Sequence, residues 1–356
     1  MNKLTIYVAK TVLVTTIIVA VALMSIFIII TLLTQAGDIG KGNYSTLDAF
    51  LYVIYQVPGN LYLILPMSAL IGCLMGLGLL ANNSELIVMR AAGYSIFQIS
   101  RGVLLAGAII AIFAFILGAY IAPLASKQAE FNRTVATDDS STIIANTSEE
   151  LWLKDRNDFI HVNKNTLTGD LSNIVRYNFK DGQLTNVTTA KTADYKDSQW
   201  KMEDVTSTTL SKTKITNQHT SVAIWDSLVP PKLLKVIGVN TRYLTIGSLI
   251  EYIQYNKSNH QDTQSTELSL WQIIFQPLTV IVLMMVAVPF VFGPMRSSAM
   301  GFKVILGLML GFVFFIINQF FGPLTLVYNL PPFLGAALPF MLFVIALVLL
   351  FWRMRE

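Results

Sequence analysis

Long apolar segments without any charge recur along this chain, and they are the strongest pattern in the sequence. Residues 11–33, 61–80, 103–123, 271–292, 304–323 and 333–352 contain no Asp, Glu, Lys or Arg. Each segment is about 20 residues long, which is the length of a helix that crosses roughly 30 Å of hydrocarbon. The pattern therefore predicts six transmembrane helices. The first run is longer than the core of a secretory signal and no small-residue cleavage pattern follows it, so we interpret it as a retained helix.

Between the third and fourth predicted helices the chain changes to short alternations of apolar and polar residues. Asp181-Gly182 lies between two such runs and predicts a hairpin turn. The spacing of apolar residues over 245–255 predicts a short amphipathic helix. Many short strands without a helical period indicate a sandwich or jelly roll. Runs typical of strands begin at Leu151, Phe159, Ile174 and Trp200.

Basic residues are concentrated on one side of the predicted helices. The short loops on the other side contain only Lys41. The side richer in Lys and Arg is expected to be cytoplasmic, so both termini are cytoplasmic and the β segment is extracytoplasmic. The basic residues on the cytoplasmic side are Lys3, Lys10, Arg90, Arg101, Arg296, Lys303, Arg353 and Arg355.

The predicted fold is therefore an α-helical membrane protein with six transmembrane helices and an inserted all-β jelly-roll domain. We expect the first three helices within residues 1–123, the β domain with its linkers within 124–270, and the last three helices within 271–356. The inserted segment holds 16 Lys+Arg and 17 Asp+Glu, so the net charge of +4 follows from the membrane topology. It does not indicate a nucleic-acid partner.

The sequence offers no catalytic centre. Only 13% of the residues are charged, and none lies in the middle of a predicted span, where ion-coupled carriers need ionisable groups. Gly40-Lys41 is the nearest match to a phosphate-binding loop, but Gly42 replaces its Ser or Thr and no glycine stands five positions upstream. The three histidines are widely separated and Cys73 is the only cysteine. We therefore expect no enzyme activity, no cofactor and no metal.

A short loop between the second and third predicted helices has the features of a small helix. Ser84 is a residue type that caps helices, Glu85 suits the positive N-terminal end, and Gly93 suits the C-terminal end. Two interpretations are open on physical grounds. The loop is either an ordinary capped connector or a coupling helix that docks into a cytoplasmic ATPase.

Three separated blocks of this sequence resemble the LptF/LptG permease family of lipopolysaccharide export. They agree with the family in order and spacing from end to end of the chain, and they are most similar to its LptG branch. The blocks are GLGLLANNSELIVMRAAG at 76–93, FGPMRS at 292–297 and FGPLTLVYNLPP at 321–332.

This resemblance implies the permease subunit of an ATP-driven ABC transporter in the bacterial inner membrane. Such a transporter extracts lipopolysaccharide and passes it to a periplasmic bridge towards the outer membrane, while a separate ATPase hydrolyses ATP. The implied partners are lipopolysaccharide, membrane lipids, a sister permease of the LptF type, two copies of an LptB-type ATPase, and a single-span periplasmic jelly-roll protein of the LptC type. The large domain is then periplasmic.

The resemblance also assigns residues to two roles. The family's coupling helix maps onto residues 84–92, with Glu85 at its acidic position. The expected ATPase-coupling residues are Ser84, Glu85, Leu86, Met89 and Arg90. The family's lateral gate between spans one and five of opposite subunits is expected to use Ile26, Ile30, Gly307, Gly311 and Phe315.

Substrate-binding residues are less well marked. Relatives carry lysines just outside span one, whereas this chain has Asp38, which repels phosphate, and one nearby lysine, Lys41. We therefore expect lipid phosphates to meet Lys41, Lys127 and Arg133. The alternative is that these basic side chains are simply solvated.

Two other functions fit the membrane topology. One is the permease of a lipoprotein-release or efflux ABC transporter, although such permeases often have four spans and a domain after the first. The other is a non-transporting membrane scaffold. Co-purification of an ATPase and a lipid distinguishes the transporters from the scaffold.

Overall fold

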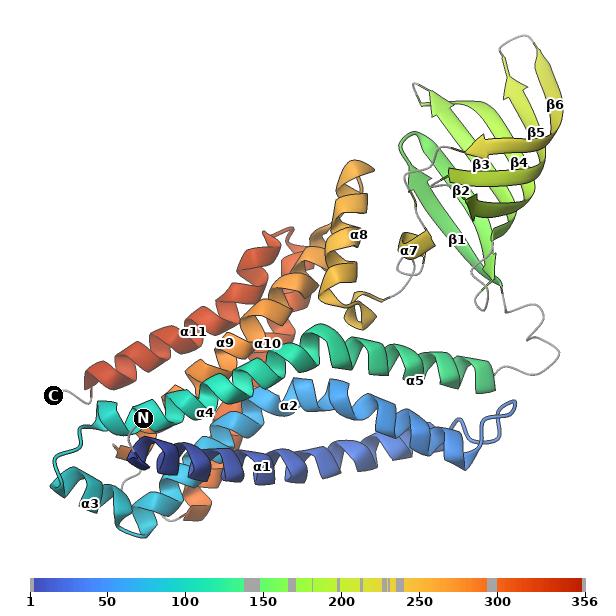
Figure 1. The fold of residues 1–356 in the computed structure, drawn as a ribbon. Coiled ribbons are helices and arrows are strands. Elements are labelled where there is room, and N and C mark those ends of the chain that lie inside the picture. The colour runs from blue at the N-terminus through green and yellow to red at the C-terminus, as the bar shows by residue number, and fades with distance from the viewer. Residues whose placement is uncertain are drawn as a thin grey trace. The chain divides into compact units, whose positions relative to one another are not determined.

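The computed structural model describes residues 3–137, 148–165, 171–180, 182–196, 199–211, 214–225, 229, 231–234, 240–292 and 300–353. Its contacts divide the chain into two compact units, whose elements are labelled in Figure 1. We call Met1–Ile39, Ser45–Arg133 and Glu267–Glu356 the membrane unit. Gly40–Tyr44 and Thr134–Thr266 form the β unit.

The prediction of six membrane-spanning helices is confirmed. Within the described part of the chain, six helices are long and apolar enough to cross a membrane, and each contains one of the predicted segments. They are α1 (Lys3–Ala36), α2 (Thr46–Asn82), α4 (Ile96–Ile116) with its continuation to Thr137, α9 (Gln264–Phe292), α10 (Met300–Val327) and α11 (Pro332–Arg353).

The third helix continues well beyond its predicted end. A π-helical segment, η1 (Leu117–Ile121), joins α4 to α5 (Ala122–Thr137), and Figure 1 shows them as one long helix. The sequence did not reveal α5 because its residues are too polar for a membrane pattern. Its residues nevertheless support a helix through local pairs, such as Glu130 with Arg133 at 3.3 Å and Gln128 with Asn132 at 2.7 Å.

Glycines bring α1 into direct contact with α2. A Cβ added at Gly72 would overlap the backbone of Thr16, and one at Gly76 would lie 2.7 Å from Thr15 Oγ1. Thr15 Oγ1 also donates a 2.7 Å hydrogen bond to the carbonyl oxygen of Gly72. The Gly-x-x-x-Gly spacing therefore serves close helix packing inside this subunit.

This contact divides α1 into two halves. The N-terminal half packs into the membrane unit, where an added Cβ at Gly102 of α4 would lie 2.7 Å from Val8 Cβ. The C-terminal half leaves most of its apolar side chains exposed, among them Val21, Ile26 and Leu33. Buried residues of α1 are accordingly concentrated at Val8, Ala9, Val12, Thr15, Thr16 and Val19.

The side chain of Lys303, one of the basic residues assigned to the cytoplasmic side, is enclosed by the protein. It is fully buried near the start of α10, and its Nζ has no hydrogen-bond partner within the described residues. Arg296 and Arg355 lie outside the described residues. The block at 292–297 that carries part of the family resemblance does so as well, except for Phe292.

The predicted inserted β domain is also confirmed. Six antiparallel strands form one sheet in the order β1-β2-β3-β4-β5-β6. Over the described residues this order is a meander, so the crossing between two sheets that defines a Greek-key jelly roll is not seen there. The strands are β1 (Ser148–Asp155), β2 (Asp158–Asn165), β3 (Leu171–Lys180), β4 (Gln183–Lys196), β5 (Gln199–Leu210) and β6 (Ile215–Trp225).

The predicted strand runs and hairpin agree with this sheet. The runs at Leu151, Phe159, Ile174 and Trp200 lie in β1, β2, β3 and β5. Lys180 pairs with Gln183 across the predicted hairpin, and Gly182 has the positive φ of 76° that such a turn requires. Asp181 lies outside the described residues.

One face of the sheet carries the core of the β unit. Alternate side chains such as Leu151, Leu153, Ile160 and Val162 are buried there, together with Trp200 and Trp225. The short helix α7 (Pro231–Leu234) and the predicted amphipathic helix, which is α8 (Ile246–Ser258), add apolar side chains to this cluster. A 3-10 turn, η2 (Thr241–Tyr243), precedes α8.

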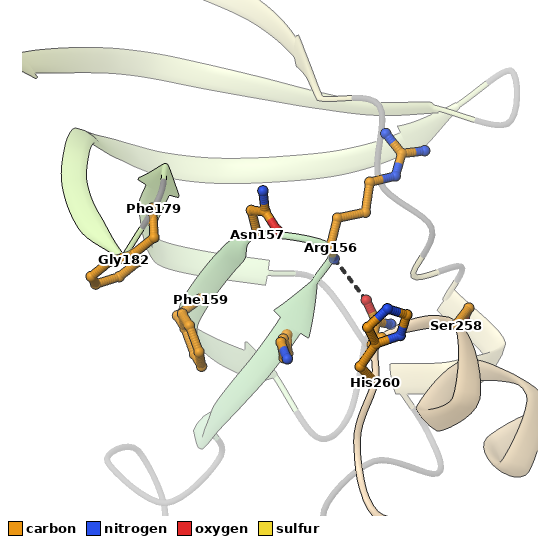
Figure 2. A pocket seen from close by; sticks show the side chains of 9 residues that line it. Arg156, Asn157, Phe159, Phe179, Gly182, Ser258 and His260 are labelled. Atoms are coloured by element: carbon orange, nitrogen blue, oxygen red, sulfur yellow. Dashed lines mark hydrogen bonds between the residues drawn. The ribbon is translucent and has the colours of Figure 1, made fainter.

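Hydrogen bonds join the end of α8 to the β1–β2 hairpin. Tyr255 Oη donates to the carbonyl oxygen of Lys154 at 2.7 Å and accepts from the Lys154 amide at 3.3 Å. The amide of Arg156 donates to Asn259 Oδ1 at 2.7 Å, the bond drawn in Figure 2. The helix and the hairpin therefore form one rigid corner of the β unit.

A cavity of about 400 Å³ lies at this corner. In Figure 2 the Arg156 side chain is directed away from Phe159 and Phe179. The basic groups of the lining therefore do not converge on one point. The lining residues are Lys154, Arg156, Asn157, Phe159, Phe179, Gly182, Ser258, Asn259 and His260.

The close approach at Gly72 predicts that Gly72→Ala destabilises the membrane unit. The added methyl group forces α1 away from α2, which costs about 1–3 kcal/mol and lowers the unfolding midpoint by several degrees. Cys73 is fully buried and is the only cysteine, so its reaction with a thiol-reactive dye on heating in detergent reports this unfolding. Gly301→Ala is the control, because an added Cβ there meets nothing within 4 Å. Equal midpoints for the two variants would contradict the packing described here.

Tyr255 lies at the corner between α8 and the β1–β2 hairpin, and it predicts that the β unit becomes less stable at alkaline pH. Burial raises the pKa of Tyr255 to about 12, whereas an exposed tyrosine titrates near about 10. The contribution of neutral Tyr255 to the free energy of unfolding is therefore complete below about pH 10. It is lost as the pH rises to about 12. Tyr255→Phe removes this dependence and costs about 1 kcal/mol at neutral pH through the lost hydrogen bonds.

Urea unfolding at several pH values measures this effect through the fluorescence of Trp200 and Trp225, which are buried in the β unit. Trp271 and Trp352 are replaced by Phe in the background to remove the signal of the membrane unit. The control is Tyr252→Phe, which changes the ring that stacks on Tyr255 at 6.3 Å. If the free energy of unfolding depended on pH in the same way for the wild type and Tyr255→Phe, Tyr255 would not be the source of the pH dependence.

Candidate functional sites

The loop between α2 and α4 contains the predicted helix, α3 (Glu85–Ala91). Its boundaries agree with the predicted signals at both ends, since Gly93 follows with a positive φ of 88°. Ser84 occupies the N-cap position but differs from expectation. It has a φ of 61° and its side chain makes no capping hydrogen bond, because it completes the tight turn from α2 through its own amide.

The two faces of α3 differ in exposure. Leu86 and Met89 are buried in the core of the membrane unit. Ile87 and Val88 are 50% and 65% exposed, and Arg90 is exposed beside them. An uninterrupted apolar run on a two-turn helix must place some side chains outward, which is the signal that sequence reasoning missed.

Glu85 is held in place by two side-chain hydrogen bonds. Tyr7 Oη of α1 donates to Glu85 Oε2 at 2.8 Å, and Asn83 Nδ2 donates to Oε1 at 3.3 Å. The first of these bonds joins α3 to α1 through two residues, Glu85 and Tyr7, that are 78 positions apart in the sequence. No pattern in the sequence points to Tyr7.

A cavity of about 420 Å³ lies beside α3, between the ends of α2 and α9 and the start of α4. Its lining is apolar except for Arg90. The exposed side chains of α3 and this cavity together make a surface that we call the α3 surface. The cavity is lined by Ala81, Leu86, Ile87, Arg90, Ala91, Ile96, Val291 and Phe292.

The predicted phosphate ligand Arg133 lies in an ion-pair cluster. Its Nη2 and Nε donate to Asp38 Oδ2 at 2.7 and 3.1 Å, and its Nη1 donates to Glu130 Oε1 at 3.3 Å. The guanidinium carbon lies 5.9 Å from the ring centre of Tyr52. Asp38, expected only to repel phosphate, is therefore the closest ionic partner of Arg133.

The other two predicted ligands, Lys127 and Lys41, are both exposed. Lys127 is exposed on α5, and its spacing of six residues from Arg133 puts the two on different faces of the helix. Lys41 is exposed in the loop after α1 and belongs to the β unit, where the amide of Asn43 donates to the carbonyl oxygen of Ala136 at 2.8 Å.

The predicted gate residues divide into two groups. Ile26 and Ile30 are 54% and 52% exposed on the free half of α1, as a gate surface requires. Gly307 and Gly311 instead face α2 of the same chain, where an added Cβ at Gly307 would lie 2.9 Å from Leu74 Cδ1. These two glycines therefore permit a close approach of α10 to α2 of the same chain. Phe315 is half-buried. The exposed apolar residues in the middle of α10 include Ile305, Leu308, Met309, Phe312, Val313 and Ile316, and we call them the exposed face of α10.

Comparison with known proteins gives matches over the full length of the chain. Residues 6–353 match the family described as lipopolysaccharide export system permease LptF/LptG. The chain is 36% identical over 337 residues to the lipopolysaccharide export system permease protein LptG of Escherichia coli strain K12, covering 94% of this chain and 93% of that protein. It is 30% identical over 358 residues to the protein of the same name from Haemophilus influenzae, covering 100% and 99%.

Proposed function

Because this chain belongs to the LptF/LptG family of lipopolysaccharide export permeases, we propose that it is the permease subunit of an ATP-driven ABC transporter. The transporter extracts lipopolysaccharide from the inner membrane and passes it to a periplasmic bridge towards the outer membrane. The observation that carries this proposal is the family match along nearly the whole chain, together with six helices and an inserted β unit. It favours this function over lipoprotein release, efflux or a scaffold.

The proposed orientation has both termini and α3 in the cytoplasm and the β unit in the periplasm. Lys3, Lys10, Arg90 and Arg101 flank the cytoplasmic ends of the described helices in this orientation. The N-terminal half of α1 is then its cytoplasmic half. The proposed division into residues 1–123, 124–270 and 271–356 follows from the same orientation.

The α3 surface is the proposed docking site for the partner ATPase of the LptB type. Ile87 and Val88 are apolar side chains outside the predicted hydrocarbon segments, and a partner protein that covers them removes them from water. Arg90 and Glu85 add opposite charges at the same helix, which can fix the register of the partner. Leu86 and Met89 pack in the core of the membrane unit and hold α3 against it.

The free half of α1 and the exposed face of α10 are the proposed lateral gate. Apolar side chains on both surfaces can face lipid tails or the equivalent helices of a sister permease of the LptF type without desolvating any charge. Lipopolysaccharide enters between the two subunits at these surfaces. Two permeases and two ATPase copies complete the transporter.

The β unit is proposed to join the periplasmic bridge through an edge of its sheet. β6 pairs with β5 on one side, and no strand pairs with its other side among the described residues. Unpaired amide and carbonyl groups at such an edge can extend a sheet into a partner. The proposed partners at this edge are jelly-roll domains, among them that of the single-span protein of the LptC type.

The coupling role of α3 is tested by changing Glu85. We expect ATPase association and lipopolysaccharide release to decrease in the order wild type, Glu85→Ala, Glu85→Lys, because reversing a charge at an interface costs more than removing it. Tyr7→Phe keeps the carboxylate but removes its 2.8 Å hydrogen bond from α1, so we expect an intermediate loss of release. The measurement is ATP-driven release from proteoliposomes that contain the chain, its sister permease and the ATPase, beside co-purification of the ATPase.

Two features of this experiment separate coupling from folding. Loss of the dipole interaction at the start of α3 costs at most about 1 kcal/mol, so all variants should keep the thermal midpoint of the wild type within a few degrees. The matched control is Glu251→Lys, a charge reversal at an exposed residue of α8. Assembly and release at the wild-type level by Glu85→Lys would exclude α3 as the coupling helix.

A further inference from the structure

The C-terminal end of α1 is tied to α5 by the pair Asp38–Arg133. Asp38 lies in the turn that follows α1, where its amide donates to the carbonyl oxygen of Gln35 at 3.0 Å. Both Nε and Nη2 of Arg133 donate to the same carboxylate oxygen. The side chains are 15% and 34% exposed, so this pair is partly shielded from water and salt.

The remaining donors of Arg133 are also oriented by the protein. Nη1 donates to Glu130, whose other carboxylate oxygen accepts from Tyr52 Oη at 3.5 Å. Gln56 Nε2 in turn donates to Tyr52 Oη at 3.2 Å. One cation with two carboxylates gives the cluster of Asp38, Glu130 and Arg133 a formal charge of −1. In this arrangement the cluster does not attract an anion.

A guanidinium group that is fixed in this way has the geometry for a phosphoryl group. Its planar set of N–H donors matches two oxygens of a carboxylate or a phosphate equally well. Asp38 uses the Nε and Nη2 edge that such a ligand would use. A phosphoryl ligand that binds this edge of Arg133 therefore has to replace Asp38.

We propose that Asp38 is an internal competitor for the lipid-phosphate site at Arg133, an inference that rests on the proposed function. A phosphoryl group on the sugar head of the transported lipid displaces the Asp38 carboxylate and takes over its two hydrogen bonds. When Asp38 returns, it displaces the phosphoryl group and promotes release of the lipid. Asp38 thus sets how tightly and how long the site holds its ligand.

Replacement of Asp38 by a phosphoryl group also affects the free half of α1, which is part of the proposed lateral gate. Asp38 follows directly on the exposed half of α1, so the ion pair holds the free end of that helix against α5. Displacement of Asp38 by the ligand removes this attachment. Occupancy of the phosphate site and freedom of the C-terminal half of α1 are therefore linked.

The test measures lipid binding by the complete transporter in nanodiscs. The probes are lipid A with two phosphates and the same lipid after dephosphorylation. Asp38→Asn removes the competing charge, so we expect about three- to tenfold tighter binding of the phosphorylated lipid and slower ATP-driven release. Binding of the dephosphorylated lipid should not change. Asp38→Glu keeps the charge and should behave as the wild type.

Further variants separate competition from a structural effect. Arg133→Gln should weaken binding of the phosphorylated lipid, and adding Asp38→Asn to it should have no further effect. Glu130→Gln is the matched control, because its contact with Arg133 is longer at 3.3 Å and its side chain is 39% exposed, so its effect should be smaller. Unchanged or weaker binding by Asp38→Asn would overturn the proposal while the proposed function stands. A wild-type transporter that binds neither lipid would instead contradict the proposed function and this inference with it.

Discussion

The close contact of α1 with α2 is the constraint on which the rest of the membrane unit depends. Gly72 and Gly76 allow the backbone of α1 to approach within a distance that no side chain could occupy, and Thr15 adds a hydrogen bond to the Gly72 carbonyl. The N-terminal half of α1 is therefore fixed to its own subunit. Its C-terminal half projects apolar side chains outward, and this division makes one helix both an anchor and a proposed gate.

Each end of α1 carries a polar contact that joins it to a different functional surface. Tyr7 near its N-terminus donates to Glu85 of α3, and Asp38 just after its C-terminus accepts from Arg133 of α5. A change at the proposed ATPase surface and a change at the proposed phosphate site therefore both reach the same helix. Because the buried half between them cannot slide without separating Gly72 from Thr16, we expect motion to be confined to the exposed half.

The sequence was sufficient for the spans and for four of the six described strands, because burial of apolar residues and the two-residue alternation are local patterns. It was not sufficient for α5, whose helix depends on polar pairs such as Glu130–Arg133. Exposure could not be predicted residue by residue either. Leu86 and Met89 point inward while Ile87 and Val88 point outward, and Gly307 faces α2 rather than a partner, because only the tertiary packing decides which side of a helix is covered. The pairing of Asp38 with Arg133 joins positions 95 residues apart and leaves no local signal.

A reversible disulfide across the proposed gate tests the central claim most directly. One cysteine replaces Ile26 on the free half of α1, the other lies at the facing level of the fifth helix of the sister permease, and Cys73 is replaced by Ala. The account predicts that oxidation blocks ATP-driven release of lipopolysaccharide and that reduction restores it. A cysteine that replaces Val14 on the anchored half is the control for position, since that part of α1 is not expected to move. Unchanged release with the Ile26 bridge demonstrably formed would contradict the account.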